Sequence, residues 1–432
     1  MPSVETNDRN SLLPDGNPDF PEILLAFKPS QLKSATGSGT RKYALELSIV
    51  MPCLNEADTL GICILKAQAA IHELNVDAEI VVADNGSTDG SQDIARELGA
   101  RVVNVAARGY GNALMGGIEA SRGRYVIMGD ADDSYDFGEI GKFLKPLRDG
   151  ADLVQGCRLP KGGGTILPGA MPLLHRWPGN PMLTMLVRKL FHAPINDVYC
   201  GLRGFTRQLF DDLDLRCTGM EFATEMVIKT ARFGKIIRET PITLHPDGRK
   251  SHPPHLRTFR DGWRTLRFFL LYSPRWFYIV PGMLLVILGI AGYALALPGI
   301  SVFGATLDVH TLLVASLTVL VGTQSLLFGV FARIFAVSQG MLPGSEKADR
   351  LIRYANPERG LLFGGTCCAI GMIMLAAESF HWWQTGFGRL DYSQTMRFVI
   401  PAVTLIALGY QTVISTFMCG LLMMARRPNA KE

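Results

Sequence analysis

Two aspartates two positions apart are the residues with the clearest chemical meaning in this sequence. Asp130 and Asp132 follow the apolar segment Arg124–Met128, and alternate residues of an extended chain point to the same side. Two like charges this close are unfavourable unless a cation neutralises them, and Mg²⁺ is commonly held by one or two carboxylates together with substrate phosphates. The pair therefore predicts a Mg²⁺ or Mn²⁺ site, although a solvated acidic turn would have the same sequence.

Short apolar segments precede the main groups of polar residues in the first half of the chain. These segments are Leu47–Met51, Glu79–Ala83, Arg101–Val105 and Arg124–Met128. Because they alternate with helical segments, they predict an α/β domain with a mostly parallel sheet covered on both faces. Ligands of such sheets bind at the carboxyl ends of the strands. We therefore expect one site that includes Pro52, Asn55, Glu56, Asp84, Asp130 and Asp132.

A glycine pair and the charge balance exclude two other functions. Gly109 and Gly111 begin a possible dinucleotide-binding fingerprint, but Leu114 stands where that pattern requires glycine. A Rossmann redox enzyme is therefore disfavoured. The chain has 43 Lys and Arg against 39 Asp and Glu, a net charge of +4, which gives no reason to expect nucleic acid as a partner.

About the last third of the chain has the composition of a membrane domain. The sequence is 48% hydrophobic and only 19% charged. Its longest apolar runs are Tyr278–Leu297, Thr311–Val337, Leu361–Ala377 and Phe398–Ala425. Since a helix of about 20 apolar residues matches the hydrocarbon thickness of a bilayer, we expect a multi-pass integral membrane protein with an all-α bundle of four transmembrane helices. Four core helices of a large soluble protein are the weaker alternative.

Basic residues predict how these helices are oriented. Most lie from the end of the second run to the start of the third, or in the C-terminal tail: Arg333, Lys347, Arg350, Arg353, Arg359, Arg426, Arg427 and Lys431. By the positive-inside rule, the N-terminal domain and both termini are expected to be cytoplasmic. Residues 1–44 are polar and show no signal-peptide pattern, so we interpret them as a disordered leader.

A basic segment joins the two halves of the chain. Its cations are Arg249, Lys250, Arg257, Arg260, Arg264, Arg267 and Arg275, against the single acid Asp261. Leu256, Phe259, Trp263, Leu266 and Leu270 recur at helical spacing within it. A basic amphipathic helix of this kind is attracted to anionic lipid head groups and lies in the membrane interface. A solvated juxtamembrane helix is the alternative. The expected boundaries are thus 1–44, 45–248, 249–277 and 278–432.

A series of short motifs over about residues 46–260 resembles family 2 glycosyltransferases with the GT-A fold. The motifs are Met51–Glu56 (MPCLNE), Asp84–Gly90 (DNGSTDG), Asp130–Asp132 (DAD), Gly156–Arg158 (GCR), Asp197–Arg203 (DVYCGLR) and Met220–Glu225 (MEFATE). Each motif is weak alone, and the specificity lies in the series. The whole series is similar to that of polyprenyl-phosphate glycosyltransferases, the group of dolichyl-phosphate mannose and glucose synthases.

This resemblance implies inverting transfer of a hexose from a nucleotide sugar, of the UDP-glucose or GDP-mannose type, to a polyprenyl phosphate such as dolichyl or undecaprenyl phosphate. It implies nucleotide binding by Pro52, Asn55, Glu56, Asp84, Gly109 and Asp130, and metal binding by Asp130 and Asp132. It implies acceptor-phosphate binding by Arg158, Arg176, Asn180 and Arg249, a catalytic role for Asp130, Asp132, Arg158 and Asp197, and support from Arg203 and Glu225. For Arg158, pairing with Asp152 or Asp197 in a purely structural role stays open, as does a phosphate contact for Arg203.

The implied chemistry needs no dedicated base. A polyprenyl phosphate is already an anion near neutral pH, so the nucleophile needs positioning, and a metal offsets the charge that develops on the leaving diphosphate. Arginine suits the acceptor because its planar guanidinium binds phosphate through two parallel hydrogen bonds. Membrane lipid is an expected partner, and a homo-oligomer stays open.

The sequence departs from the family pattern at two positions. Asn85 stands where members often have a second Asp, and Ser134 stands where dolichyl-phosphate mannose synthases commonly have a metal-contacting Gln. The second departure leaves the third metal contact undefined, and Asp133 or Asp136 is a candidate replacement.

Two other functions compete with this interpretation. A processive polysaccharide synthase or translocator would use the spans as a channel, but such synthases usually carry Gln-x-x-Arg-Trp. The nearest match here, Leu173–Trp177, lacks the Gln. A non-catalytic membrane scaffold is disfavoured because the acidic strand ends occur together.

Overall fold

The structure, a computed structural model, describes residues 43–173, 175–249, 258–302, 305–344 and 357–423. The predicted leader lies almost entirely outside these ranges. So do Lys250 and Arg257 of the basic segment, the cations Lys347, Arg350 and Arg353, and the C-terminal tail. The loop charges that predict the orientation therefore lie largely outside the described residues.

A seven-stranded sheet forms the centre of the N-terminal domain, with the order β3-β2-β1-β4-β7-β5-β8. Its strands are β1 (Leu45–Cys53), β2 (Ala78–Asp84), β3 (Arg101–Asn104), β4 (Gly123–Met128), β5 (Leu153–Cys157), β7 (Arg203–Thr206) and β8 (Ile237–Pro241). Only β7 runs antiparallel to its neighbours, β4 and β5. The four predicted strands are confirmed as β1 to β4, and the mostly parallel GT-A-like sheet is confirmed with them.

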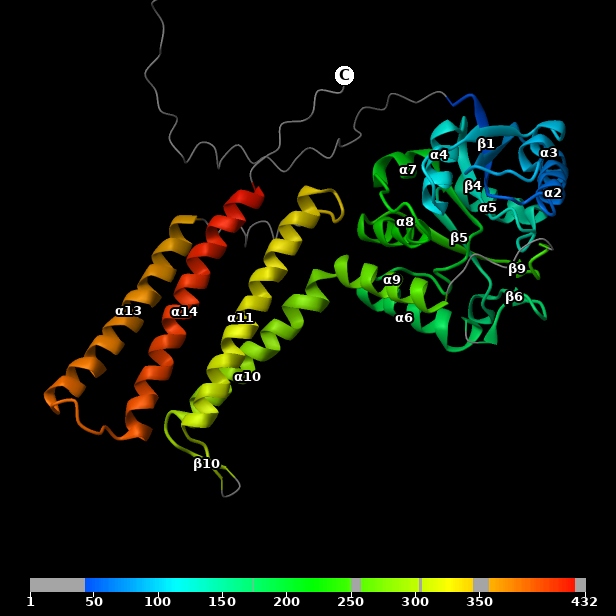
Figure 1. The fold of residues 1–432 in the computed structure, drawn as a ribbon. Coiled ribbons are helices and arrows are strands. Elements are labelled where there is room, and N and C mark those ends of the chain that lie inside the picture. The colour runs from blue at the N-terminus through cyan, green and yellow to red at the C-terminus, as the bar shows by residue number, and fades with distance from the viewer. Residues whose placement is uncertain (1–42, 174, 250–257, 303–304, 345–356, 424–432) are drawn as a thin grey trace, which may run out of the picture. The chain divides into compact units, whose positions relative to one another are not determined.

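Helices cover both faces of this sheet (Figure 1). One face packs on α2 (Leu60–Glu73), α3 (Ser91–Glu97), η1 (Phe137–Ile140) and α5 (Gly141–Arg148). The other packs on α4 (Tyr110–Ala120), α6 (Asn180–Phe191), α7 (Arg207–Leu213) and α8 (Glu221–Arg232). Within β1, Ile49 and Met51 face the first layer and Val50 faces the second. Because both faces are buried, the central strands are continuously apolar.

Short elements follow β5 and β8 in the chain. They are η2 (Pro160–Gly162), η3 (His175–Gly179), and the parallel pair β6 (Thr165–Ile166) and β9 (Thr243–Leu244). They carry the chain between β5 and α6 and again after β8. The predicted acceptor residues Arg176 and Asn180 lie here, in η3 and at the start of α6.

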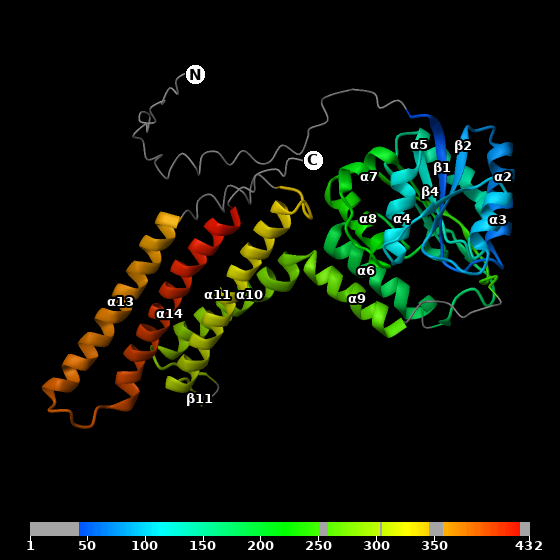
Figure 2. The same ribbon diagram turned by 45° about the horizontal axis from the view of Figure 1, so that its top comes forward.

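The basic segment forms α9 (Thr258–Leu271), seen beside α6 in Figures 1 and 2. Phe268, Phe269 and Tyr272 pack into the core cluster of the sheet domain, and the rings of Phe269 and Phe191 lie 6.1 Å apart. Trp263 on the predicted apolar face is 63% exposed. The helix thus has a second apolar face, which the sequence prediction missed, and membrane contact by the first face stays a prediction.

In the part of the chain that the structure describes, four helices are long and apolar enough to cross a membrane, in agreement with the predicted number of spans. They are η4 (Arg275–Ile279) continued by α10 (Val280–Ala296), then α11 (Val309–Ser338), α13 (Pro357–Gln384) and α14 (Tyr392–Met423). Between the first two lies the hairpin of β10 (Ser301–Val302) and β11 (Ala305–Thr306). The third helix is longer than its apolar run. Close helix contacts occur at glycines such as Gly364 and Gly409, as is usual between membrane helices.

Candidate active site

The carboxyl end of β1 leads into a turn that is fixed to the turn after β2. Asn55 adopts φ 59°, a left-handed conformation that asparagine tolerates better than most residues. Its backbone N–H donates to the Ser87 hydroxyl at 2.9 Å, and its side-chain oxygen accepts from the Thr88 N–H at 2.9 Å. Glu56 follows, 5% exposed, with its backbone N–H donating to Ser91. Pro52, Asn55 and Glu56 are therefore held at one edge of the sheet.

Asp84 closes the turn after β2. It is 2% exposed and accepts hydrogen bonds from the backbone N–H groups of Gly86 and Ser87 and from Gln92, the last at 2.7 Å. The carboxylate thus shapes the turn from inside. Its predicted role in nucleotide binding stays a prediction.

Asn85 explains one departure from the family pattern. Its amide nitrogen donates to the carbonyls of Val105 and Ala107 at 2.9 and 2.8 Å, and its amide oxygen accepts from the N–H of Gly109. A carboxylate has no hydrogen to donate, so these contacts require the amide. They hold the loop that carries Gly109. A side chain is excluded at this residue, because its φ is 134° and an added Cβ would lie 2.5 Å from the backbone oxygen of Thr218.

The acidic pair lies at the carboxyl end of β4, beside Glu56. Asp130 accepts from the Tyr110 hydroxyl at 2.8 Å, and Asp132 accepts from the Ser134 hydroxyl at 2.6 Å and its backbone N–H at 3.0 Å. Burial, together with the negative charge of Asp132, raises the pKa of Asp130 to about 6. Both causes oppose a second negative charge, and a divalent cation would relieve them.

Both residues predicted to replace the missing Gln, Asp133 and Asp136, already have other partners. Asp133 forms an ion pair with Lys66 at 2.7 Å, and Asp136 accepts from the Gly138 N–H at the start of η1. Within the described ranges, no group of three or more His, Cys, Asp or Glu residues is placed to hold a metal. Ser134 instead orients Asp132. Two carboxylates fit Mg²⁺ or Mn²⁺ that completes its shell with diphosphate oxygens and water.

Arg249, from the C-terminal end of the domain, also lies at this site. Its guanidinium binds both oxygens of Glu56 at 2.7 Å, contacts Asp247 at 2.8 Å and lies 3.4 Å from Asp132. Glu56 and Arg249 are predicted for different substrates, nucleotide and acceptor phosphate, yet the structure brings them together. Arg249 therefore lies among the residues predicted for the donor.

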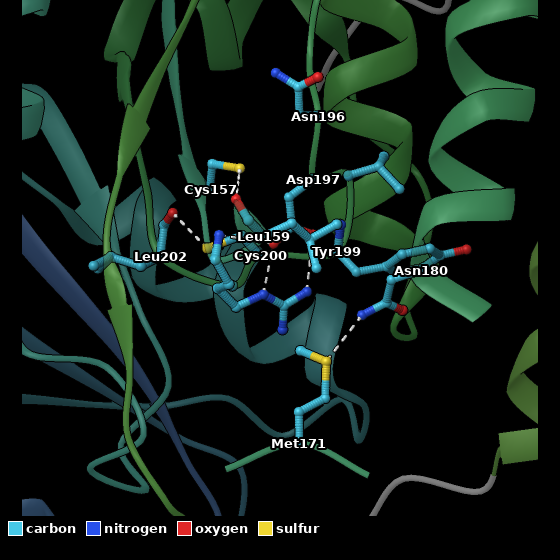
Figure 3. Close-up of polar contacts among 12 residues, drawn as sticks. Cys157, Leu159, Met171, Asn180, Asn196, Asp197, Tyr199, Cys200 and Leu202 are labelled. Atoms are coloured by element: carbon cyan, nitrogen blue, oxygen red, sulfur yellow. Dashed lines mark hydrogen bonds and ion pairs between the residues drawn. The ribbon is translucent and has the colours of Figure 1, made fainter. Parts of the chain in front are cut away.

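Arg158 and Asp197 form a buried ion pair. The Arg158 Nε and Nη2 atoms donate to the two Asp197 oxygens at 2.7 and 2.9 Å, and the Arg158 backbone N–H donates at 3.0 Å. The side chains are 10% and 0% exposed. Figure 3 shows Asp197 among Cys200, Tyr199 and Cys157. Pairing with Asp197, the structural alternative left open for Arg158, is the arrangement observed.

Arg176 and Asn180 are not hydrogen-bonded to this pair among the described residues. Arg176 in η3 is half-buried and its Nε has no hydrogen-bond partner. Asn180 donates to the sulfur of Met171 at 3.7 Å (Figure 3). Among the described residues, no hydrogen bond joins either of them to Arg158 or Arg249. Of the four predicted acceptor residues, Arg158 and Arg249 are thus each paired with carboxylates.

Arg203 is a buried structural residue. It is fully buried in β7, where its guanidinium donates to the carbonyls of Cys200 and Ala223. Burial lowers the pKa of this arginine from its usual value. Through these contacts Arg203 supports the Cys200–Gly201 turn beside Asp130. Because its side chain does not reach solvent, Arg203 is not available for the phosphate contact that the sequence left open.

Two tyrosines complete the site, and the sequence did not single out either. Tyr110 donates to Asp130, as described above. The Tyr135 hydroxyl accepts from the Gly201 N–H at 2.8 Å and lies 3.5 Å from Arg158 Nη1. Tyr135 is thus placed between the ion pair and the acidic pair. The only sequence signal for Tyr110 was its position inside the rejected glycine pattern.

Glu225 connects α9 to the loop before α8. One of its oxygens accepts from the Tyr272 hydroxyl at 2.9 Å and from Lys229 at 3.0 Å. The other accepts from the backbone N–H groups of Arg216 and Cys217 at 2.9 and 2.8 Å. Hydrogen bonds to the charged form and the ammonium of Lys229 keep the pKa of Glu225 low against the opposing effect of burial. These contacts hold Glu225 in place, and its supporting role in the site stays a prediction.

The loop that Glu225 fixes is also connected to Asp130 of the acidic pair. The carbonyl of Thr218 accepts from the N–H groups of Gly111 and Asn112 at the start of α4. The neighbouring Tyr110 donates to Asp130. Hydrogen bonds between neighbouring chain segments therefore connect Tyr272, directly after α9, through Glu225 and the 216–218 loop to Tyr110 and the acidic pair.

Removing the Tyr272 hydroxyl tests this link. We expect Tyr272→Phe to weaken nucleotide-diphosphate binding several-fold, measured by titration of the full chain without acceptor. One hydrogen bond to a charged group is worth about 1.5–3 kcal/mol, and its loss frees the loop against α4. Phe268→Leu removes packing from the same helix without touching Glu225 and is the control. Equal affinities in the two variants would contradict the link.

Comparison with known proteins gives matches over both halves of the chain. The family model described as "Glycosyl transferase family 2" matches residues 48–214. The model described as "Glycosyltransferase family 2 C-terminal transmembrane region" matches residues 330–423. The first covers the sheet from β1 to α7 with the acidic pair, and the second covers the end of α11 with α13 and α14.

Two curated relatives come from Haloferax volcanii. The chain is 36% identical to its low-salt glycan biosynthesis hexosyltransferase Agl6 over 388 residues, which covers 89% of this chain and 91% of that protein. It is 34% identical to the dolichyl-phosphate hexose transferase over 198 residues, 46% of this chain and 82% of that protein. A solved glucosyl-3-phosphoglycerate synthase from Mycobacterium tuberculosis aligns at 23% identity and a TM-score of 0.39 over 53% of this chain and 78% of that one. A similarity of that size carries no argument about ligands.

Proposed function

Because this chain belongs to glycosyltransferase family 2, we propose that it transfers a hexose from a nucleotide sugar to a membrane polyprenyl phosphate with inversion at the anomeric carbon. The acidic pair beside Glu56 at the carboxyl edge of the sheet is the observation that carries this proposal. The four apolar helices in the same chain support a lipid acceptor. The catalytic domain and both termini are proposed to be cytoplasmic, from the loop charges.

On the donor side, Asp130 and Asp132 would hold Mg²⁺ or Mn²⁺. When bound, the metal offsets the charge on the leaving nucleoside diphosphate. Pro52, Asn55, Glu56, Asp84 and Gly109 are proposed to line the nucleotide pocket. Tyr110 and Ser134 each hold one carboxylate in a fixed direction, and such fixed groups need no reorganisation during the reaction.

On the acceptor side, we assign the phosphate first to Arg176. Its Nε has no hydrogen-bond partner among the described residues, whereas Arg158 and Arg249 are already paired with carboxylates. Arg158 is proposed to orient the acceptor through its remaining Nη1, with Asp197 holding it. The lipid phosphate is already anionic, so these residues position the nucleophile and take no proton from it.

Replacing Arg176 separates acceptor from donor recognition. We expect Arg176→Ala to raise the KM for polyprenyl phosphate roughly ten- to a hundredfold, because one charge-assisted contact is worth about 1.5–3 kcal/mol. Arg176→Lys should recover part of this loss, since a point charge cannot reproduce the guanidinium fork. Nucleotide affinity without acceptor should stay unchanged. Arg188→Ala, which removes an exposed arginine of α6, is the control. Equal loss of donor and acceptor binding would exclude the assignment.

The donor is identified by a panel of sugar nucleotides with polyprenyl phosphate, read by the mass of the lipid product. A product carrying one hexose supports the proposal, whereas a growing polymer would point to the processive synthase. The panel compares UDP-glucose, GDP-mannose and related donors at equal concentration.

A further inference from the structure

Three arginines meet outside the site described above. Arg232 is the last residue of α8, Arg275 is the first of η4, and Arg333 lies near the end of α11. Burial lowers the pKa of Arg232, and the positive charges of Arg333 and Arg275 lower it further. The effect of both neighbours places the three guanidinium groups close enough to repel one another.

The packing of the first two membrane helices independently places two of the three arginines, Arg275 and Arg333, near each other. Gly282 contacts Gly322 and Gly292 contacts Ala315, so the two helices run antiparallel. The Ser325 hydroxyl donates to the Tyr278 carbonyl at 3.0 Å. A Cβ added to Gly329 would lie 2.7 Å from Ile279. Arg333 is one helical turn after Gly329, and Arg275 is one turn before Ile279, so this register brings the two arginines to the same level.

This cluster has no counter-charge within the described residues. None of its three arginines forms an ion pair or a side-chain hydrogen bond there, and the Nε atoms of Arg232 and Arg333 are buried without a partner. Other arginines of the domain have partners for their charge: Arg158 pairs with Asp197 and Arg249 with Glu56, and Arg207 donates to backbone carbonyls. Arg203 also donates to carbonyls, although its Nε has no partner among the described residues. Like charges held together with unsatisfied donors favour an anion among them.

We propose that Arg232, Arg275 and Arg333 bind the phosphate group of a membrane lipid on the side of the bilayer that carries the catalytic domain. Guanidinium groups match phosphate geometry through paired hydrogen bonds. Arg275 begins the first span and Arg333 lies near the end of the second, so both belong to the same membrane surface. Trp276 and Phe277, 45% and 47% exposed, follow Arg275, and exposed aromatic residues of this kind are typical of the membrane interface.

Two lipids could supply this phosphate, an anionic phospholipid of the bulk membrane or a polyprenyl phosphate. Both present an anionic phosphate at head-group depth, where basic clusters attract it. The site differs from Arg158, Arg176 and the acidic pair, and its lipid binding does not require glycosyl transfer. A binding measurement therefore tests it separately from the proposed reaction.

The experiment is native mass spectrometry of the full chain in detergent, titrated with phosphatidylglycerol, phosphatidylcholine or polyprenyl phosphate. We expect the first phosphatidylglycerol to bind at least tenfold more tightly than phosphatidylcholine. The double variant Arg232→Gln/Arg333→Gln should lose at least tenfold in that affinity. Arg238→Gln removes an exposed arginine from β8 and is the matched control, with wild-type affinity expected.

Stability without lipid provides a second readout. Because the arginines repel one another, the double variant should unfold at the same temperature as the wild type or higher, and only the stabilisation by added lipid should disappear. Arg232→Gln alone lies outside the spans, leaves membrane insertion untouched and should lose several-fold in lipid affinity. Preference for polyprenyl phosphate over phosphatidylglycerol, lost in the variants, would identify the acceptor lipid as the occupant, and equal affinities would identify bulk phospholipid. Wild-type binding of both lipids by the double variant would overturn the proposal.

Discussion

Asp132→Ala is expected to lower hexose transfer roughly a hundred- to a thousandfold, the loss typical of removing one group that stabilises charge in the transition state. EDTA should abolish transfer by the wild type, and added Mg²⁺ or Mn²⁺ should restore it. The measurement is the rate of radiolabelled hexose transfer to polyprenyl phosphate by membrane-embedded protein. The variant should remain folded, because among the described residues the Asp132 carboxylate contacts Ser134 and, at 3.4 Å, Arg249, and the backbone hydrogen bond from Gly248 to its carbonyl is kept.

Asp133→Ala is the matched control. It removes the adjacent carboxylate, which forms an ion pair with Lys66, and should retain most activity and the same metal requirement. Loss of transfer in Asp133→Ala as large as in Asp132→Ala would make Asp133 the third metal contact after all. Full transfer by Asp132→Ala in the presence of chelator would remove the metal from the mechanism.

Arg158→Ala should lower the free energy of unfolding by about 3–5 kcal/mol, because it leaves the fully buried Asp197 without its counter-charge. Denaturant unfolding of the full chain in detergent, followed by tryptophan fluorescence, measures the change. Since the Asp197 carboxylate also accepts from the backbone N–H groups of Arg158 and Tyr199, the loop between β5 and α6 should loosen with it.

Two comparisons separate this loss from a general effect of removing arginine. Arg148→Ala breaks an exposed ion pair with Glu46, and we expect it to cost about 1 kcal/mol or less. The double variant Arg158→Leu/Asp197→Leu should recover much of the stability, since apolar residues can replace a buried ion pair. It should nevertheless stay inactive if Arg158 orients the acceptor. Recovery of both stability and transfer would leave the pair with a structural role only.

Three of the four strands that the sequence predicted have a burial that is visible locally, whereas β3 is only partly buried. β1, β2 and β4 are continuously apolar because both of their faces are covered. β7 could not be predicted in this way, because its four residues, RGFT, include one large apolar side chain and a charged one. Its burial depends on β4 and β5, which lie far away in the sequence.

The site shows the same limit. The carboxylates at the ends of β2 and β4 could be predicted, because parallel strands bring their carboxyl ends to one edge. The contact between Glu56 and Arg249 joins residues 193 positions apart, and no local pattern indicates it. On α9, apolar residues occur on both sides, so spacing alone could not tell that Phe268 and Phe269 face the domain.

The antiparallel strand β7 also determines the order in which the domain can assemble during synthesis. β5 leaves the ribosome before β7, yet the place beside β4 belongs to β7. Until residues 203–206 emerge, β4 presents an unpaired edge, which is the kind of edge that associates with other nascent chains. β8 then adds to β5, and every strand of this sheet precedes the first span, which begins at Arg275. The catalytic sheet therefore needs no segment of the membrane domain for its completion, and the nascent chain can close its exposed edge before the translocon receives the first helix.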